Sequence, residues 1–290
     1  MKILVVSPYR GIGDLIFHLP LLRYLKKKYK TKLNLITVHN SKAKIILKGE
    51  NLVSKVIYGD FNRQNVLKKI LKLKNEINRI NSDITVLSAS SKRLKASLIL
   101  SNSKKKISFS KSNEKDLSKY IYNETKKIFS LKKLEKNYKL ISSPFSKKNR
   151  KIFLNIDSFH NQNNWGEKNY INLINNITEK KSKLFINFSP RNKKKFLFVI
   201  SLMKNKPNIE FTYNKNFKYV LKVIRNCNYI IGNESGPICL GAAFRKKVLS
   251  IYNPKTTPKS SKTIFNKVSF INSSKLKNSV IQKKIIKFIS

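Results

Sequence analysis

The 290-residue sequence contains few acidic residues and few cysteines. Its 14 Asp and Glu residues face 63 Lys and Arg residues, which gives a formal net charge of +49. The two cysteines, Cys227 and Cys239, are too few for a disulfide framework. We therefore expect free thiols in a reducing cytoplasm.

Long apolar runs are also absent. No uninterrupted apolar stretch approaches the ~20 residues that a membrane-spanning helix requires. The N-terminal apolar run covers only Ile3 to Val6 and leads into a glycine-containing turn, which does not fit a signal peptide. These absences predict a protein that is soluble or attached to the surface of a membrane.

The positive charge is spread along the whole chain. Lys accompanies Asn, Ile and Ser in every segment, as in proteins of AT-rich genomes, and forms no basic arm. No zinc-finger spacing, aromatic RNP motif or basic zipper region is present. The charge therefore predicts loose attraction to an anionic membrane surface, and we expect no specific binding of nucleic acid.

Short apolar runs alternate with amphipathic segments, which is typical of an α/β protein whose parallel sheets are covered by helices. The segment 141–150 contains Ser and Pro and has no periodicity, which predicts a linker. We therefore divide the chain into a domain at 1–145, a domain at 146–275 and a C-terminal helix within 276–290. The expected strands are 2–7, 33–38, 53–58, 84–87, 106–109, 151–156, 184–188, 209–212, 229–231 and 248–251.

The turn after the first expected strand carries Arg10, Gly11 and Gly13, and Asp14 begins an amphipathic helix at 14–29. Pro20 predicts a kink in this helix or a later start. A dinucleotide-binding motif would need a third glycine at Ile16, and no G-K-[ST] follows, which excludes a P-loop. Two roles fit Asp14: a cap of the helix and a general base.

Residues 227–253, CNYIIGNESGPICLGAAFRKKVLSIYN, predict a strand, a glycine-containing loop, a short helix and a second strand. The loop offers the Glu234 carboxylate, the Ser235 hydroxyl and Gly236 just before a helix N-terminus, which attracts anions. In a parallel sheet such a loop lies at the carboxyl ends of the strands, where ligands bind. An ordinary connection without a ligand fits the same residues.

These two motifs resemble those of the ADP-heptose:lipopolysaccharide heptosyltransferases, the inverting transferases of glycosyltransferase family 9. The resemblance implies a GT-B fold: two Rossmann-like domains facing across a cleft, acceptor side first and donor side second, with the last helix packed back on the first domain. The matching residues of the first motif are Gly11, Gly13, Asp14, Pro20 and Leu25. Those of the second motif are Asn233, Ser235, Gly236, Pro237, Gly241, Ala242, Ala243 and Pro254.

The resemblance implies an enzyme that moves heptose or a similar sugar from a nucleotide-diphosphate donor to a lipopolysaccharide, glycolipid or saccharide of the cell envelope. No cofactor or metal is expected, and we expect a cytoplasmic monomer at the inner membrane surface. Asp14 would be the general base, and the turn Arg10, Gly11 and Gly13 would hold the acceptor. The implied donor-binding residues are Ser158, Asn163, Trp165, Lys168, Asn192, Asn233, Glu234, Ser235, Gly236, Pro237 and Cys239.

Four donor-side positions depart from the family pattern. Asn163 replaces a Lys, Asn192 a Glu, Glu234 an Asp and Cys239 a His, and Lys168 is a nearby substitute for the missing Lys. An asparagine cannot neutralise a diphosphate. The departures leave a second function open, a catalytically degenerate GT-B protein that binds a carbohydrate or nucleotide without turnover.

Overall fold

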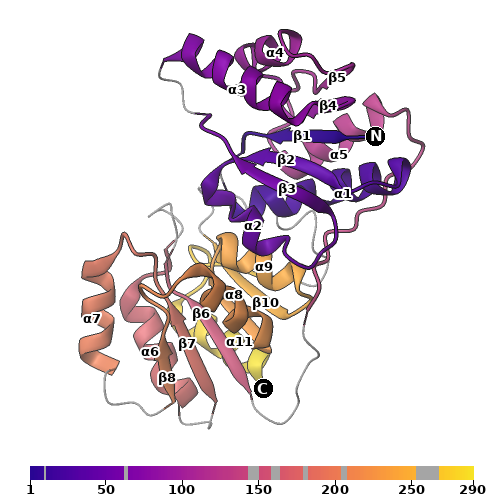
Figure 1. Ribbon diagram of the computed structural model, residues 1–290. Coiled ribbons are helices and arrows are strands. Elements are labelled where there is room, and N and C mark those ends of the chain that lie inside the picture. The colour runs from indigo at the N-terminus through magenta and orange to yellow at the C-terminus, as the bar shows by residue number, and fades with distance from the viewer. Residues whose placement is uncertain are drawn as a thin grey trace. The chain divides into compact units, whose positions relative to one another are not determined.

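A computed structural model describes residues 1–9, 11–61, 65–142, 150–157, 164–178, 182–203, 208–252 and 268–290. The chain divides into two compact units, Met1–Tyr138 and Lys139–Ser290, whereas the sequence analysis placed the division after residue 145. Each unit contains one sheet in which all the strand pairs are parallel (Figure 1). The predicted α/β class with two parallel-sheet domains is confirmed.

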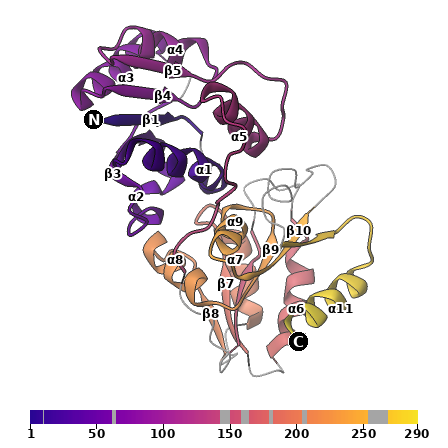
Figure 2. The same cartoon turned by 90° about the vertical axis from the view of Figure 1, so that its right-hand side faces the viewer.

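The first unit has a five-stranded sheet with the order β3-β2-β1-β4-β5. β1 lies at its centre and is buried at every residue, because its apolar run has a strand on each side. The strands are β1 (Ile3–Ser7), β2 (Leu33–Thr37), β3 (Val53–Tyr58), β4 (Ile84–Leu87) and β5 (Lys105–Ser108). The helices are α1 (Ile12–Tyr29), the 3-10 helix η1 (His39–Ser41), α2 (Ala43–Ile46), α3 (Val66–Ile80), α4 (Lys92–Ile99) and α5 (Leu117–Ile128). α1 contacts α5 and α3 contacts α4, and the two pairs lie on opposite faces of the sheet (Figure 2).

The second unit has a six-stranded sheet with the order β11-β10-β9-β6-β7-β8. Its strands are β6 (Lys151–Asn155), β7 (Lys183–Asn187), β8 (Ile209–Phe211), β9 (Tyr229–Asn233), β10 (Lys247–Tyr252) and β11 (Val268–Asn272). Its helices are α6 (Glu167–Thr178), α7 (Lys193–Met203), α8 (Phe217–Asn226), α9 (Gly236–Ala243) and α11 (Asn278–Ile289). The sequence analysis missed β11, an edge strand in which one residue of five is buried.

The expected start of α1 needs correction. α1 begins at Ile12 and continues through Pro20, so Pro20 does not delay its start. In the Lys-rich segment 110–140 the helix is α5, which starts where the Asp116 carboxylate accepts hydrogen bonds from the N–H groups of Ser118 and Lys119.

The last helix, α11, packs against the apolar core of the second unit. Ile281, Ile285 and Ile289 on α11 are buried in the same apolar core as Trp165. The Trp165 Nε1–H also donates to Asn278 Oδ1 at 3.0 Å. The apolar face of α11 is therefore buried in this core.

Two glycines allow α9 and its loop to lie close to the sheet. Gly232 has a φ of +152°, and a Cβ on it would lie 2.2 Å from the carbonyl oxygen of Asn155, its register partner on β6. On α9, a Cβ at Gly241 would lie 2.7 Å from Ile230 Cγ1. The close approach holds the N-terminus of α9 at the carboxyl end of β9.

We expect Gly232→Ala to destabilise the second unit by about 4 kcal/mol or more, because the new methyl group would meet backbone atoms that belong to a central strand. Urea unfolding followed by the fluorescence of Trp165, the chain's one tryptophan, measures this loss. Gly166→Ala is the control, since its φ is +100° and its Cβ would meet only Asn169 Nδ2 at 3.4 Å. It should lose about 1–2 kcal/mol from backbone strain alone. Equal losses in the two variants would contradict the steric account.

Candidate functional site

Asp14 lies in the first turn of α1, which follows the carboxyl end of β1. Its Oδ2 accepts the backbone N–H of Gly11, the N-cap residue, at 2.8 Å. A Cβ at Gly11 would lie 3.1 Å from this oxygen, so glycine leaves room for the carboxylate. The capping bond is therefore present. Asp14 is also half-buried, not fully buried, and so retains a surface to offer a substrate.

The other residues of the predicted acceptor turn are less informative. Gly13 is the second residue of α1, and Arg10 lies outside the described residues. Tyr9, just before the turn, has a pKa raised first by burial and then by the neighbouring Tyr120 and Asp14. Its phenol consequently stays protonated beside the Asp14 carboxylate.

His18 joins this turn to the sheet, and the sequence analysis did not consider it. The ring is completely buried, with Nδ1 2.7 Å from the Asp14 carbonyl oxygen and Nε2 2.9 Å from Ser88 Oγ and 3.3 Å from Ser7 Oγ. Burial lowers its pKa to about 4, although the bond to the Asp14 backbone acts in the opposite direction. The ring is therefore neutral. One signal was available: a histidine one helical turn after Asp14 on an otherwise apolar stretch.

Asn233, at the end of β9, holds the second unit's loops together. Its Oδ1 accepts from the Trp165 backbone N–H at 3.1 Å and from Tyr170 Oη at 2.9 Å. Its Nδ2 donates to the Ile156 carbonyl and to Asn164 Oδ1. The side chain is 0% exposed. All of its hydrogen-bonding capacity is therefore directed at the protein.

Trp165 and Cys239 are also buried among the residues that support the loops of the second unit. Each is 5% exposed, and the Trp165 ring packs against Tyr170 with their centroids 5.0 Å apart. Cys239 lies within α9, and no disulfide joins it to Cys227. Both side chains pack inside the second unit, and the contact with a donor that the resemblance implies for them stays a prediction.

At the carboxyl ends of the second unit's strands, the residues around the N-terminus of α9 are more accessible than Asn233, Trp165 and Cys239. Glu234, Ser235, Gly236 and Pro237 are all half-buried. Ser235 is the N-cap of α9, but its side chain does not cap the helix; its Oγ donates to the Asn233 carbonyl at 2.9 Å. Pro237 has no N–H. The first turn of α9 consequently presents backbone N–H groups that no N-cap side chain covers, at the positive end of the helix dipole.

A row of neutral polar side chains crosses the carboxyl ends of four strands. Asn155 Nδ2 donates to Ser235 Oγ at 2.9 Å, Asn187 Nδ2 donates to Asn155 Oδ1 at 2.7 Å, and Thr212 Oγ1 donates to Asn187 Oδ1 at 2.7 Å. The sequence analysis missed this row. The signal was the repeated ending of the strands, since β6, β7 and β9 each finish with Asn.

Asp157, two residues after β6, accepts hydrogen bonds from the loop between β7 and α7 and holds it in place. It is 4% exposed; its Oδ2 accepts from the Ser189 N–H at 2.9 Å and its Oδ1 accepts from Asn192 Nδ2 at 2.5 Å. Asn192, an implied nucleoside contact, therefore has its amide engaged with a carboxylate of the protein.

Among the remaining implied donor residues, Lys168 is exposed in the first turn of α6. Beside it, Glu167 pairs with Lys195 of α7 at 2.6 Å. Ser158 and Asn163, like Pro254 of the second motif, lie outside the described residues. Within the described part of the chain, no cluster of His, Cys, Asp and Glu could hold a metal ion.

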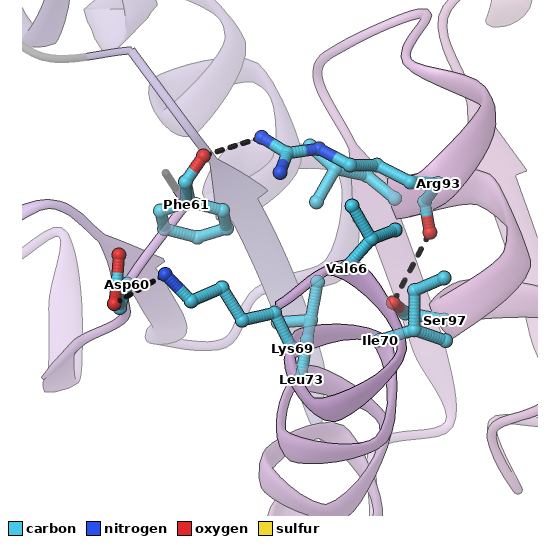
Figure 3. A pocket seen from close by; sticks show the side chains of 9 residues that line it. Asp60, Phe61, Val66, Lys69, Ile70, Leu73, Arg93 and Ser97 are labelled. Atoms are coloured by element: carbon cyan, nitrogen blue, oxygen red, sulfur yellow. Dashed lines mark hydrogen bonds and ion pairs between the residues drawn. The ribbon is translucent and has the colours of Figure 1, made fainter. Parts of the chain in front are cut away.

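A small cavity lies between α3 and α4 of the first unit (Figure 3). It offers about 10 Å³, the space of one water molecule. Its charged groups have partners: Lys69 Nζ lies 2.8 Å from Asp60 Oδ2, and the Arg93 guanidinium donates to the Phe61 carbonyl oxygen. The cavity is therefore a packing feature and too small for a sugar or a nucleotide.

Comparisons with known proteins point to one family. A model of glycosyltransferase family 9 (heptosyltransferase) matches residues 85–287, which include the β9–α9 loop but not Asp14. The structure is similar to that of E. coli ADP-heptose lipopolysaccharide heptosyltransferase II, with a TM-score of 0.81, 13% identity and coverage of 100% of this chain and 98% of that one.

Two further solved structures give the same picture. The family 9 glycosyl transferase of Veillonella parvula DSM 2008 has a TM-score of 0.79 and 12% identity, and covers 99% of this chain and 97% of its own. E. coli heptosyltransferase WaaC with ADP has a TM-score of 0.74 and 14% identity, with 99% and 100% covered. No curated protein matches the sequence.

The depressed pKa of His18 predicts a pH-dependent stability. An unfolded chain binds a proton on His18 below about pH 6.5, but the native chain does so only below about pH 4. The unfolded state therefore binds more protons in this window, and the native state loses about 2 kcal/mol between pH 7.5 and pH 5 on this account. Urea unfolding followed by circular dichroism should show a shallower pH dependence for His18→Asn. The surface variant His39→Asn should keep the wild-type slope, and a loss of slope there would contradict the assignment.

Proposed function

The chain belongs to glycosyltransferase family 9 (heptosyltransferase), and from this premise we propose that it transfers heptose or a similar sugar, with inversion, from a nucleotide-diphosphate donor to a hydroxyl of a cell-envelope lipopolysaccharide or saccharide. The observation that carries the proposal is the position of the Asp14 carboxylate. It is half-buried, accepts the Gly11 N–H and follows the carboxyl end of β1, where ligands of parallel α/β sheets bind.

Asp14 is the general base of the proposed reaction. Attack by an acceptor hydroxyl on the anomeric carbon requires loss of the hydroxyl proton, and a positioned carboxylate takes it as the new bond forms. The N-terminus of α1 favours the ionised carboxylate. The Gly11 N–H bond at 2.8 Å fixes Oδ2, so the carboxylate has a defined direction.

The β9–α9 loop is the proposed donor site. The departing nucleoside diphosphate gains negative charge, and the N–H groups of the first turn of α9 and the helix dipole stabilise it. Glu234, half-buried next to this turn, suits hydroxyl groups of the ribose or the sugar. Lys168, exposed at the start of α6, is the proposed substitute for the lysine that Asn163 replaces. We propose no cofactor and no metal requirement.

A screen for donors and a base variant test this assignment together. With ADP-, GDP-, UDP- and dTDP-sugars, one nucleotide class should raise the melting temperature, because it binds only the folded protein. Glu234→Gln should remove the shift. Asp14→Asn should keep the shift but lower turnover at least about 100-fold, since an amide cannot accept the proton. A chelator should leave turnover unchanged.

Asp60→Asn is the matched control, because Asp60 is a carboxylate of the same unit that pairs with Lys69. It should alter neither the shift nor turnover. A thermal shift without turnover in the wild type would favour the alternative, a catalytically degenerate binding protein. Full turnover in Asp14→Asn would contradict the role of Asp14 as base.

We also propose that the protein works as a monomer in the cytoplasm, attached to the surface of the inner membrane. The outer face of α3 supports attachment: Leu67 and Leu71, one turn apart, are 78% and 53% exposed, and Lys68 and Lys72 are exposed beside them. Such a face inserts apolar side chains between lipids while lysines meet anionic headgroups. In the described segments, no helix is long and apolar enough to cross a membrane.

Vesicle co-sedimentation tests the α3 face. The wild type should bind vesicles that contain phosphatidylglycerol and should bind neutral phosphatidylcholine vesicles far more weakly. Leu67→Ser with Leu71→Ser should weaken binding about tenfold, because two apolar side chains no longer insert. Leu197→Ser with Leu202→Ser on α7, where the two leucines are 49% and 53% exposed, is the control. If the α7 pair reduced binding and the α3 pair did not, the α3 assignment would be wrong.

A further inference from the structure

We propose that His18 is a positioning residue for Asp14. Its imidazole connects the Asp14 carbonyl group to the carboxyl ends of β1 and β4, and in this way it sets the direction of the Asp14 carboxylate. This inference rests on the proposed role of Asp14 as general base.

The hydrogen bonds of the ring define its tautomer. A carbonyl oxygen can only accept, so Nδ1, 2.7 Å from the Asp14 oxygen, carries the proton. Nε2 therefore accepts, and its nearest donor is the Ser88 hydroxyl at 2.9 Å. The Ser88 hydroxyl has a second acceptor within reach, the Val6 carbonyl at 3.1 Å. The Ser7 hydroxyl, 3.3 Å from Nε2, is a second donor to the ring, so Nε2 has two hydroxyl groups from which it can accept.

Three elements that are distant in the sequence meet at this ring. Ser7 is the last residue of β1, Ser88 follows β4 and His18 lies on α1; all three are at most 2% exposed. Tyr9 packs on the ring with the centroids 5.5 Å apart. A bond that reaches from a helix to two strand ends restrains the helix more than a bond within the helix does.

The turn needs such a restraint. It contains Gly11 and Gly13, and glycine allows many backbone conformations. Two bonds hold Asp14 from two directions: the Gly11 N–H binds its side chain at 2.8 Å, and His18 binds its backbone carbonyl at 2.7 Å. A base displaced by about 1 Å can lose 100-fold in rate. An apolar residue at position 18 would fill the core without a buried polar group but would leave the Asp14 carbonyl without this anchor.

Two amide variants separate positioning from simple core filling. In His18→Asn, the amide stands where Nδ1 was, so it can still donate to the Asp14 carbonyl but cannot reach Ser88. In His18→Gln, the longer amide reaches the Ser88 hydroxyl and leaves the Asp14 carbonyl. Both variants place one amide in the same pocket, so a purely structural role would affect them alike.

The first readout is hydrogen exchange of peptides that cover residues 11–14, which needs no substrate. Exchange should quicken at least about tenfold in His18→Gln and stay near the wild-type rate in His18→Asn, because only the Gln variant frees the turn. Thr125→Val is the control: it removes a buried bond from a side chain to a carbonyl one turn earlier, Thr125 Oγ1 to Ile121 O at 2.6 Å on α5. It should leave exchange of the turn unchanged.

The second readout is turnover with the donor and acceptor of the enzyme. His18→Gln should lower kcat about tenfold with the donor KM within about twofold of wild type, whereas His18→Asn and Thr125→Val should retain most of kcat. Equal losses in the Asn and Gln variants, or unchanged exchange in His18→Gln, would overturn the inference. Absence of turnover in the wild type would contradict the proposed function instead, and the exchange experiment would still decide whether His18 holds the turn.

Discussion

Polar side chains at the carboxyl ends of the parallel strands are buried, and each must find a hydrogen-bond partner inside its own unit. An unpaired buried amide costs about 1–3 kcal/mol, and Asn155 and Asn233 are only 2% and 0% exposed. Parallel pairing supplies the partners, because it brings the last residues of neighbouring strands side by side. Gly232 allows β9 to lie close enough to β6 for these hydrogen bonds to form. The loops that leave these strands are therefore fixed by the strand ends themselves.

This constraint separates the site residues into those that hold loops in place and those that can bind a ligand. Side chains whose hydrogen bonds all end on the protein, such as Asn233, hold loops in place and have nothing left for a ligand. Groups that remain accessible, such as Glu234 and the first turn of α9, are the ones that can bind a donor. The first unit repeats the arrangement: His18 is buried and bonded on both ring nitrogens, and Asp14 above it is half-buried.

The sequence predicted those features that local patterns determine. The bounds of β3 and β4 match the expected 53–58 and 84–87, because β4, ITVL, is an uninterrupted apolar and β-branched run and half of β3, VSKVIY, is β-branched. Features that depend on contacts between distant segments were missed. The hydrogen bond between Asn155 and Ser235 joins residues 80 positions apart, and no local sequence pattern predicts it. An edge strand such as β11 lacks the continuous apolar run of a central strand.

The proposed donor site has Asn163 where the family pattern has a lysine, which bears on how charge and geometry would contribute to its catalysis. The +49 net charge produces a positive field over much of the surface, which raises the local concentration of an anionic donor. Such a field acts on the bound substrate and on the transition state nearly alike, so it favours binding more than turnover. Stabilisation of the leaving diphosphate requires groups that are fixed where the charge appears. In the proposed donor site, the N–H groups of the first turn of α9 would meet that requirement, because Gly232 and Gly241 hold the helix against β9. The rate of transfer should consequently depend more on the rigidity of this loop than on any single lysine.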